Sequence, residues 1–364
     1  MQNNKKICLI LAVVILLVIG FALVGLNKSS RGDMSTIKIG AILPLTGSQA
    51  FLGEGMKNAL EMAKKNLGNT KYKYEVIYAD DAFDAKMAIS AANKLISVDK
   101  VDVIVDAYAP IGNAVSPITE KASVVHIDVA FDPKIAEGDY NFILFTTPDT
   151  AARSFLAEMQ KRGMTKLEII HVNNQGIFSV FQALQKSASE YGVTIVGDEI
   201  FNPGERDFRS MVTKASKNKP DLYALLAVSP ELELVAKQMH DQNIFNISST
   251  IYLELAKDKT VFEGLWSIGF GKVDSSFENQ YRSTYNRELT YGVANLYDAF
   301  NLVVKISEAN QGNSKPSREY LMQSLKNMPD TEGVLGMLHI NPEGIIDNPV
   351  ALKIIKDGKM VMGE

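Results

Sequence analysis

Histidines and paired carboxylates are the residues of this sequence that could perform acid–base or metal chemistry. The histidines are His126, His171, His240 and His339. No two of them stand at the short spacing of a local metal motif such as H-E-x-x-H, so the sequence predicts no zinc site of that type. His126 and His171 lie within apolar runs typical of strands, and we interpret them as buried or edge histidines.

The pair Asp80 and Asp81 ends a predicted strand, at the place where α/β proteins carry their active sites. Two carboxylates there could bind a metal or act as acid and base, but such acids more often cap the next helix or accept loop amides. Gly53 and Gly55 do not complete a dinucleotide fingerprint, no P-loop lysine follows them, and the sequence has no G-x-S-x-G elbow. We therefore expect no catalytic residues, no metal site and no cofactor, and hence no enzyme.

Strands and helices alternate regularly from residue 37 onwards. The predicted strands span 37–43, 72–79, 101–105, 124–129, 142–145, 167–172, 194–200 and 222–228. The predicted helices between them span 53–67, 85–96, 112–122, 150–162, 177–191, 208–217 and 231–242. This alternation indicates parallel sheets covered by helices on both faces, and the restart near residue 149 predicts two doubly wound α/β domains. Ligands of such domains bind outside the carboxyl ends of the strands.

The C-terminal part breaks this rhythm. Helices are predicted at 277–287, 292–310 and 317–326, and short strands at 337–340 and 351–356. These pieces are too few for a third domain, so we expect them to complete the first two. The chain then crosses between the lobes several times, which makes a hinge about which the lobes can rotate.

Composition limits the partners and the compartment. The formal net charge is −4 and there is no basic stripe, so nucleic acid is not an expected partner. The single cysteine, Cys8, leaves no disulfide for the rest of the chain. More than 300 residues remain beyond the N-terminal segment, enough for two packed cores.

The N-terminal segment predicts export. Residues 7–26 form a run of 20 apolar or small residues, long enough to span a bilayer, and Lys5 and Lys6 precede it. We expect 1–6 to be a cytoplasmic tip, 7–26 a transmembrane anchor or a signal segment, and 27–36 a tether. The run is longer than a typical signal core and no clean A-x-A follows, which favours an uncleaved anchor. The body then lies on the extracytoplasmic face of the cytoplasmic membrane, or is periplasmic or secreted if the segment is cleaved.

An ordered set of short motifs resembles the branched-chain amino-acid (Leu/Ile/Val) binding proteins, which are type I periplasmic solute-binding proteins of ABC importers. The opening segment, Ile-Lys-Ile-Gly-Ala-Ile-Leu-Pro-Leu-Thr-Gly at 37–47, precedes Ala50, Gly53 and a predicted helix. The later motifs are Asp80-Asp81, the segments 91–96 and 101–104, Gly204-Glu205-Arg206-Asp207-Phe208, Pro220-Asp221, Tyr297-Asp298-Ala299, the segment 333–336 and the segment 341–344. The resemblance covers essentially all of residues 37–360.

The resemblance implies the periplasmic binding protein-like I fold, in which two lobes joined by three crossover hinge strands close on a small ligand. By the family pattern the crossings fall near 146–149, 269–273 and 328–336. Lobe 1 then comprises 37–147 plus 274–331, and lobe 2 comprises 150–270 plus 335–364.

The family pattern also implies the ligand-binding positions, although the residues differ. The expected ligand-binding residues are Phe51, Leu52, Tyr108, Ala109, Gly112, Asn113, Ala130, Phe131, Gly176, Val228 and Tyr252. The group that would hold a ligand ammonium maps to 252–254, with Leu253 as the best register. Where the family offers hydroxyl and charged groups, this chain offers apolar and aromatic ones. A carboxylate could dock on the amides of Gly112 and Asn113 at a helix N-terminus, and the aromatic rings could stack on a flat ligand.

These differences point away from a branched-chain amino acid, because each unreplaced hydrogen bond to a buried ligand costs about 1–3 kcal/mol. We expect a monomeric extracytoplasmic protein that delivers a small ligand to an ABC permease. The expected ligand is an aromatic or apolar carboxylic acid or a non-standard amino-acid-like solute. The alternative is a ligand-sensing ectodomain of the same fold that signals through a partner.

Overall fold

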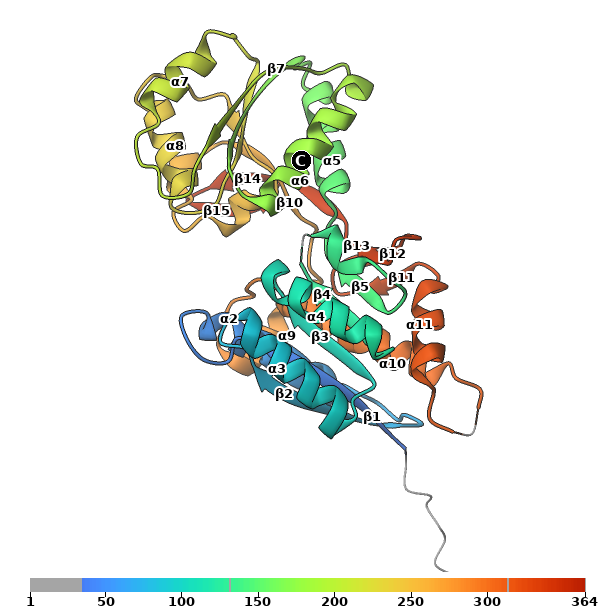
Figure 1. Ribbon diagram of the computed structural model, residues 1–364. Helices are drawn as coiled ribbons and strands as arrows, with labels where there is room; N and C mark the ends of the chain where they lie inside the picture. The colour runs from blue at the N-terminus through green and yellow to red at the C-terminus, as the bar shows by residue number, and fades with distance from the viewer. Residues whose placement is uncertain (1–34, 131, 313, 364) are drawn as a thin grey trace, which may run out of the picture.

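A computed structural model of the protein describes residues 35–130, 132–312 and 314–363. The predicted tip, anchor and most of the tether lie outside the described residues, and so does Phe131. Within the described residues, no helix is both long and apolar enough to cross a membrane. The chain folds into two α/β lobes, drawn one above the other in Figure 1, which confirms the predicted fold class.

Lobe 1 is built on one eight-stranded sheet in the described part of the chain. Its strand order is β11 (Thr331–Gly333), β12 (Gly336–Ile340), β13 (Ile345–Asp347), β5 (Asn141–Leu144), β4 (Val125–Val129), β3 (Val103–Ala107), β1 (Thr36–Leu43), β2 (Lys73–Asp80). Its helices are α2 (Ala50–Lys65), α3 (Ala85–Lys94), α4 (Ala109–Lys121), α9 (Ser275–Tyr285), α10 (Val293–Glu308) and α11 (Arg318–Lys326). A single π turn, Leu95–Asp99, extends α3.

Alternation along β1 explains why helices cover both faces of this sheet. Ile39 and Ala41 pack in one cluster with residues of α2 and α10. Ile42, which points to the other face, packs with Ala88 of α3 and Val115 of α4. The strand is therefore apolar throughout, as expected for a strand that is buried on both sides.

Lobe 2 is smaller and has two sheets. The first has the order β7 (Thr194–Phe201), β6 (Lys166–Val172), β8 (Leu222–Leu226), β9 (Ile247–Ser248), and the second β10 (Trp266–Phe270), β14 (Val350–Lys356), β15 (Lys359–Met362). The strands of the first sheet are parallel and those of the second antiparallel. The helices are α5 (Pro148–Lys161), α6 (Gln175–Ser187), α7 (Arg209–Ser216) and α8 (Glu231–His240).

The third crossing lies later in the sequence than we expected. The expected start of the second part of lobe 2 at 335 is wrong for 336–347, because β13 pairs in parallel with β5 of lobe 1, as in the register Ile345 to Ile143. Leu338 and Ile346 also pack in the core of lobe 1. The chain crosses to lobe 2 only at 348–349, between β13 and β14.

The three crossings lie side by side and are bonded to one another. The amide of Thr147, just before α5, donates to Asp347 Oδ1 at 3.0 Å. The amide of Gly271, just after β10, donates to the carbonyl of Pro349 at 2.9 Å. Connections that run together in this way restrict the lobes to rotation about a shared hinge.

Asp298 on α10 fixes the turn between β11 and β12. Its two carboxylate oxygens accept the amides of Val334 and Leu335 at 2.9 and 3.0 Å. A Cβ atom on Gly333 would lie 2.4 Å from Asp298 Oδ2, so this close approach requires glycine. Two of the sequence motifs, 297–299 and 333–336, therefore meet in one contact.

Candidate functional site

The carboxyl ends of β1 to β4 gather the residues of lobe 1 that face the predicted ligand side. Tyr108 follows β3 and stands at the N-cap of α4 with a φ of 81°. A bulky residue in this region is strained, and the surrounding structure must hold it there. Its amide donates to the carbonyl of Val129 at the end of β4, at 3.1 Å.

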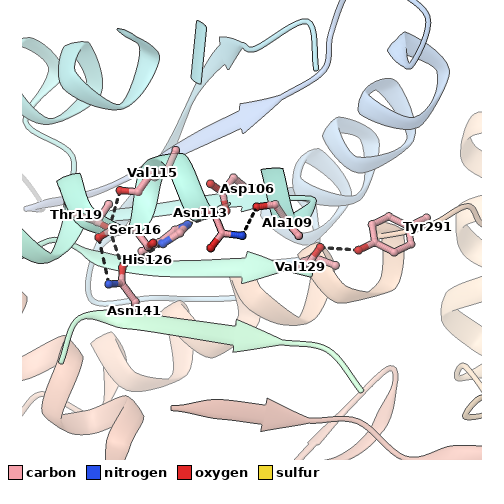
Figure 2. A network of polar contacts seen from close by, with 10 residues as sticks. All are labelled: Asp106, Ala109, Asn113, Val115, Ser116, Thr119, His126, Val129, Asn141 and Tyr291. Carbon is pink, nitrogen blue, oxygen red and sulfur yellow. Dashed lines mark hydrogen bonds and ion pairs between the residues drawn. The ribbon is translucent and has the colours of Figure 1, made fainter. Parts of the chain in front are cut away.

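A row of aromatic rings runs from this edge to the hinge. Phe83 meets Tyr108 edge-on with ring centroids 5.0 Å apart, and Tyr108 stacks on Tyr291 at 5.0 Å. Tyr291 contacts Phe145, which contacts Phe270 at the second crossing. These five residues are called the aromatic row below. Tyr291 also donates its hydroxyl hydrogen to the carbonyl of Val129 at 2.7 Å (Figure 2), which ties the row to the same carbonyl as Tyr108.

The Tyr108 hydroxyl is buried and has no hydrogen-bond partner among the described residues. Burial, together with the charge of Asp81, raises its pKa, so the hydroxyl keeps its proton and can donate to a ligand. Asp81 is itself fully buried with Oδ2 unpartnered, and burial raises its pKa to about 6. A buried hydroxyl without a hydrogen-bond partner is uncommon in folded proteins, which makes Tyr108 a candidate functional residue.

The N-terminus of α4 does not present the amides that the sequence suggested. The helix begins at Ala109 rather than at 112, so the amide of Gly112 donates to the carbonyl of Tyr108 within the first turn, at 2.9 Å. Gly112 is buried against Asp128, and Asn113 donates its side-chain hydrogens to Ala109 O and Asp132 Oδ2. The expected carboxylate site on Gly112 is therefore wrong, whereas Ala109 does lie at the start of the helix.

The remaining expected residues of lobe 1 differ in exposure. Phe51 and Leu52 lie in the first turn of α2, and Phe51 is 53% exposed. Ala130 is buried directly after β4.

Asp80 accepts hydrogen bonds from loop residues, as expected for the structural role that the sequence suggested beside a metal or acid–base role. Oδ1 accepts the amides of Leu45 and Ala82, both at 2.9 Å, and Oδ2 accepts the hydroxyl of Thr46 at 2.6 Å. Partial burial alone would raise the pKa of Asp80, but these hydrogen bonds lower it. Asp80 therefore holds the loop after β1 in place.

In the described part of lobe 2, the expected ligand-binding residues at the edge that faces lobe 1 are mostly hydrogen-bonded or buried within the lobe. Gly176 opens α6, where its amide donates to the capping Asn174, and its carbonyl accepts the hydroxyl of Tyr252 at 3.3 Å. Tyr252 is only 7% exposed, so it lies in the lobe core rather than on an open stacking surface. Val228, after β8, and Phe178, in the first turns of α6, are exposed.

The side chains of the segment expected to hold a ligand ammonium are buried or already bonded to other residues of lobe 2. Leu253 is buried, and Glu254 Oε1 accepts the amide of Phe270 at 2.7 Å and pairs with Lys353 Nζ at 2.8 Å. Glu254 therefore joins β10 to β14. Its charge is already neutralised.

A cavity of about 990 Å³ lies between the lobes beside the crossings. Its lining includes Thr147, Arg153, Lys186, Asn341 and Asp347, and none of the predicted ligand-binding residues that the structure describes. It lies beside the crossings and includes Thr147 and Asp347, which stand at the carboxyl ends of β5 and β13.

Sequence reasoning missed Phe83, Tyr291 and Phe178. Phe83 follows Asp81 by two residues, and Phe178 lies within the first turns of α6, so position relative to a strand end was an available signal for both. Tyr291 comes from a distant part of the chain and joins the site only through the packing of α10, which no local pattern reveals.

Comparisons with known proteins agree with this architecture. A family model described as periplasmic binding protein matches residues 36–359. The Leu/Ile/Val-binding protein BraC3 of Rhizobium johnstonii is 27% identical over 236 residues, which are 56% of this chain and 58% of that protein. The matched region thus spans less than two thirds of this curated relative.

Solved structures share the fold at low identity. A leucine-binding protein from Thermotoga maritima has a TM-score of 0.75 at 19% identity, over 90% of this chain and 98% of the other. A solute-binding protein of an ABC transporter from Rhodopseudomonas palustris, in complex with 3,4-dihydroxy benzoic acid, has a TM-score of 0.73 at 21% identity, over 89% and 95%. With two lobes, three crossings and a match over nearly all of its body, the chain belongs to the periplasmic binding protein family.

Proposed function

We propose that the chain is an extracytoplasmic solute-binding protein that closes its lobes on a small ligand and delivers it to an ABC permease. The family and the shared hinge support this function. In such a protein the ligand stabilises a closed conformation, and the permease recognises that conformation. The protein acts as a monomer in this proposal.

The ligand in this proposal is an aromatic or apolar carboxylic acid, or an amino-acid-like solute of unusual type. The observation that carries it is the Tyr108 edge, where a stacked ring and an unpartnered buried hydroxyl lie together. The exposed Phe178 and Val228 of lobe 2 supply apolar surface for closure. Aromatic side chains bind flat rings through offset or edge contacts, and one hydroxyl fixes their orientation.

An α-amino acid fits this edge less well. Its ammonium needs acceptors when it leaves water, and a charged group without them loses several kcal/mol, on the order of 1–3 per missing bond. Glu254, the acid in the corresponding segment, is engaged with Lys353. This argument separates the chain from the relatives named for leucine, isoleucine and valine, and it is compatible with the neighbour named for a dihydroxybenzoic acid.

The proposed ligand-binding residues follow from their places in the lobes. Lobe 1 contributes Phe51, Leu52, Tyr108, Ala109 and Ala130, with Phe83 and Tyr291 added from the aromatic row. Lobe 2 contributes Gly176, Phe178 and Val228.

The same proposal places the body at the membrane through residues 7–26. The run of apolar residues after two lysines supports it. A short tether raises the effective concentration of a binding protein at its permease.

Calorimetric titration of the purified full chain tests the ligand class. Benzoate, hydroxybenzoates and phenylacetate are compared with L-leucine and L-valine. We expect an aromatic acid to bind, and Tyr108→Phe to weaken it by about 1 kcal/mol, the contribution of one hydrogen bond. Tyr72→Phe is the matched control, because Tyr72 donates to Ser314 O beside the amino end of β2, away from the site.

Binding of leucine or valine in place of the aromatic acids would overturn the ligand class and leave the binding function intact.

A further inference from the structure

Three titratable residues meet between the sheet of lobe 1 and α4. The parallel register of β3 and β4 places Asp106 beside Asp128, and Ile104 beside His126. Because residues two apart on a strand share a face, both aspartates and the histidine lie on the same side of the sheet. His126 Nε2 lies 2.7 Å from Asp106 Oδ1, and all three side chains have no solvent exposure.

Asn141 on β5 fixes which nitrogen of His126 carries a hydrogen (Figure 2). Its Nδ2 donates to the carbonyls of Ser116 and Glu137, at 3.1 and 3.0 Å, so its Oδ1 must face His126. His126 Nδ1, 3.2 Å from that oxygen, is then the donor. The neutral imidazole therefore directs the lone pair of Nε2 toward Asp106.

The cluster lacks a positive charge. Asp106 Oδ2 and both oxygens of Asp128 are buried and accept no hydrogen bond from a donor group among the described residues, although the two carboxyl groups lie close enough to share a proton. In the same part of the chain, no lysine or arginine is paired with either aspartate. Burial raises the pKa of Asp106 to about 7 and that of Asp128 well above its ordinary value. Two carboxylates in such a place need a cation or protons.

We propose that Asp106, His126 and Asp128 hold one divalent transition-metal ion of the Zn²⁺ type. One ligand atom from each residue lies within 4.8 Å of the others. Zn²⁺ binds imidazole nitrogen and carboxylate oxygen at about 2.0–2.2 Å, so small side-chain rotations bring the three atoms onto one ion. The ion balances both carboxylates, and Nδ1–H of His126 donates to Asn141 as a metal-bound histidine donates to its outer-shell acceptor.

The surroundings allow such an ion to enter and to stay. Gly112 lets the α4 backbone approach Asp128, because a Cβ there would lie 2.4 Å from Oδ2. A cavity of about 690 Å³ is lined by Ser116 and by Asn141, whose side chain contacts His126. These two residues give the ion a polar route from solvent.

The ion would also stabilise the carboxyl ends of β3 and β4, where the proposed ligand-binding residues Tyr108 and Ala130 lie. Asp128 directly precedes Val129, whose carbonyl receives both the Tyr108 amide and the Tyr291 hydroxyl. Clamping Asp106 to Asp128 fixes the ends of β3 and β4, from which Tyr108 and Ala130 emerge. The metal site does not depend on the proposed ligand and is tested separately.

The first experiment measures metal binding by the purified full chain. The protein is stripped with a chelator and titrated with ZnCl₂ against a competing indicator, and retained metal is measured by mass spectrometry after desalting. We expect about one tightly held ion per chain and a rise in melting temperature, because binding to the folded state alone stabilises it. A chain that retains no zinc and shows no thermal shift would overturn the proposal.

Matched variants assign the ion to its ligands. Asp128→Asn keeps the shape and removes a charge, so we expect a folded protein without tight zinc binding. Asp139→Asn, an exposed acid on the loop before β5, should bind like the unchanged chain. Asn141→Ala should weaken binding by about 10–100-fold, as loss of an outer-shell partner does. Zinc binding that Asp128→Asn leaves unchanged would show an adventitious surface ion only and would refute the site.

A spectroscopic measurement on the unchanged chain keeps the test independent of folding in the variants. Cobalt replaces zinc in the stripped protein, and zinc-edge X-ray absorption is recorded in parallel. We expect the cobalt protein to show the intense visible absorption bands of a four-coordinate ion. We expect the zinc protein to show one imidazole nitrogen among the ligands of the ion. An octahedral shell of oxygens alone would contradict the assignment.

Discussion

The facing edges of the two lobes are built differently. In lobe 1 the edge carries a continuous aromatic row, the unpartnered Tyr108 hydroxyl and a buried Asp81. In lobe 2 the polar groups at the edge are used within the lobe, as with Asn174, which caps α6, and Glu254, which joins two strands. We infer that lobe 1 recognises the ligand and lobe 2 closes over it with apolar surface.

Carboxyl groups with shifted pKa values occur in both lobes, and the buried ones differ from the exposed ones. Asp81 and Asp298 of lobe 1 are buried, and the pKa of each is raised to about 6. In lobe 2, Asp221 and Glu263 accept backbone amides, and these hydrogen bonds lower the pKa of each. Glu168 of lobe 2 is buried too, and burial raises its pKa as it does for Asp81 and Asp298, so the response to acid follows the burial of each carboxyl and not the lobe.

The largest expected effect is the loss of ligand affinity in Tyr108→Ala. Removing a buried aromatic anchor at the centre of a binding site costs about 2–4 kcal/mol. Calorimetric titration with the best-binding aromatic acid measures it. An affinity within a factor of about two of the unchanged chain, less than 0.5 kcal/mol, would place recognition elsewhere.

The next effect is the pH dependence of stability that the buried Asp298 causes in lobe 1. A carboxyl whose pKa is raised binds more protons in the folded state, so stability falls as pH rises from its ordinary value to about 6 and is constant above. For Asp298 the rise of the pKa to about 6 corresponds to about 3 kcal/mol.

Hydrogen exchange at pH 4.5 and 7 measures this pH dependence. Protection in lobe 1 should be greater at pH 4.5 once the intrinsic exchange rates are corrected, and Asp298→Asn should reduce the change. A pH dependence that Asp298→Asn leaves unchanged would contradict the role of this carboxyl.

A smaller effect is expected from Glu254→Gln. The amide still accepts from Phe270, but the largely buried Lys353 loses its ion pair, which lowers stability by about 1–3 kcal/mol. Chemical unfolding measures the stability, and titration measures the affinity. If ligand binding disappears while the protein stays folded, Glu254 contacts the ligand, and the inference that lobe 1 alone recognises it is contradicted.

The smallest effect is expected for Phe178→Ala in lobe 2. The ring is 38% exposed and contacts His171 and Phe181, so truncation should weaken ligand binding by less than about 1 kcal/mol. The direct comparison with Tyr108→Ala in the same titration sharpens the difference between the lobes. A larger loss for Phe178→Ala than for Tyr108→Ala would reverse it.

Local patterns predicted most of the elements, but short strands escaped them. β11 and β13 are three residues each, too short to show a period, and β13 joins lobe 1 only because β5 leaves an open edge for it. The late third crossing follows from that pairing.

The site was predicted in part because strand ends are visible in sequence, whereas hydrogen-bond partners are not. Tyr108 could be found from its place after β3. The loss of the Gly112 amide depends on the turn at which α4 starts, and the meeting of Asp106 with Asp128 depends on the register of two strands. Neither is encoded in local spacing.

Distance measurement between the lobes tests the central claim most directly. In a Cys8→Ser background, spin labels at Ser48→Cys and Lys257→Cys mark exposed positions on lobe 1 and lobe 2. Pulsed electron resonance of the full chain should show a shorter distance when a saturating aromatic carboxylate is added, and no change with a non-binding acid. A distance distribution that stays the same at saturation would contradict closure on the ligand.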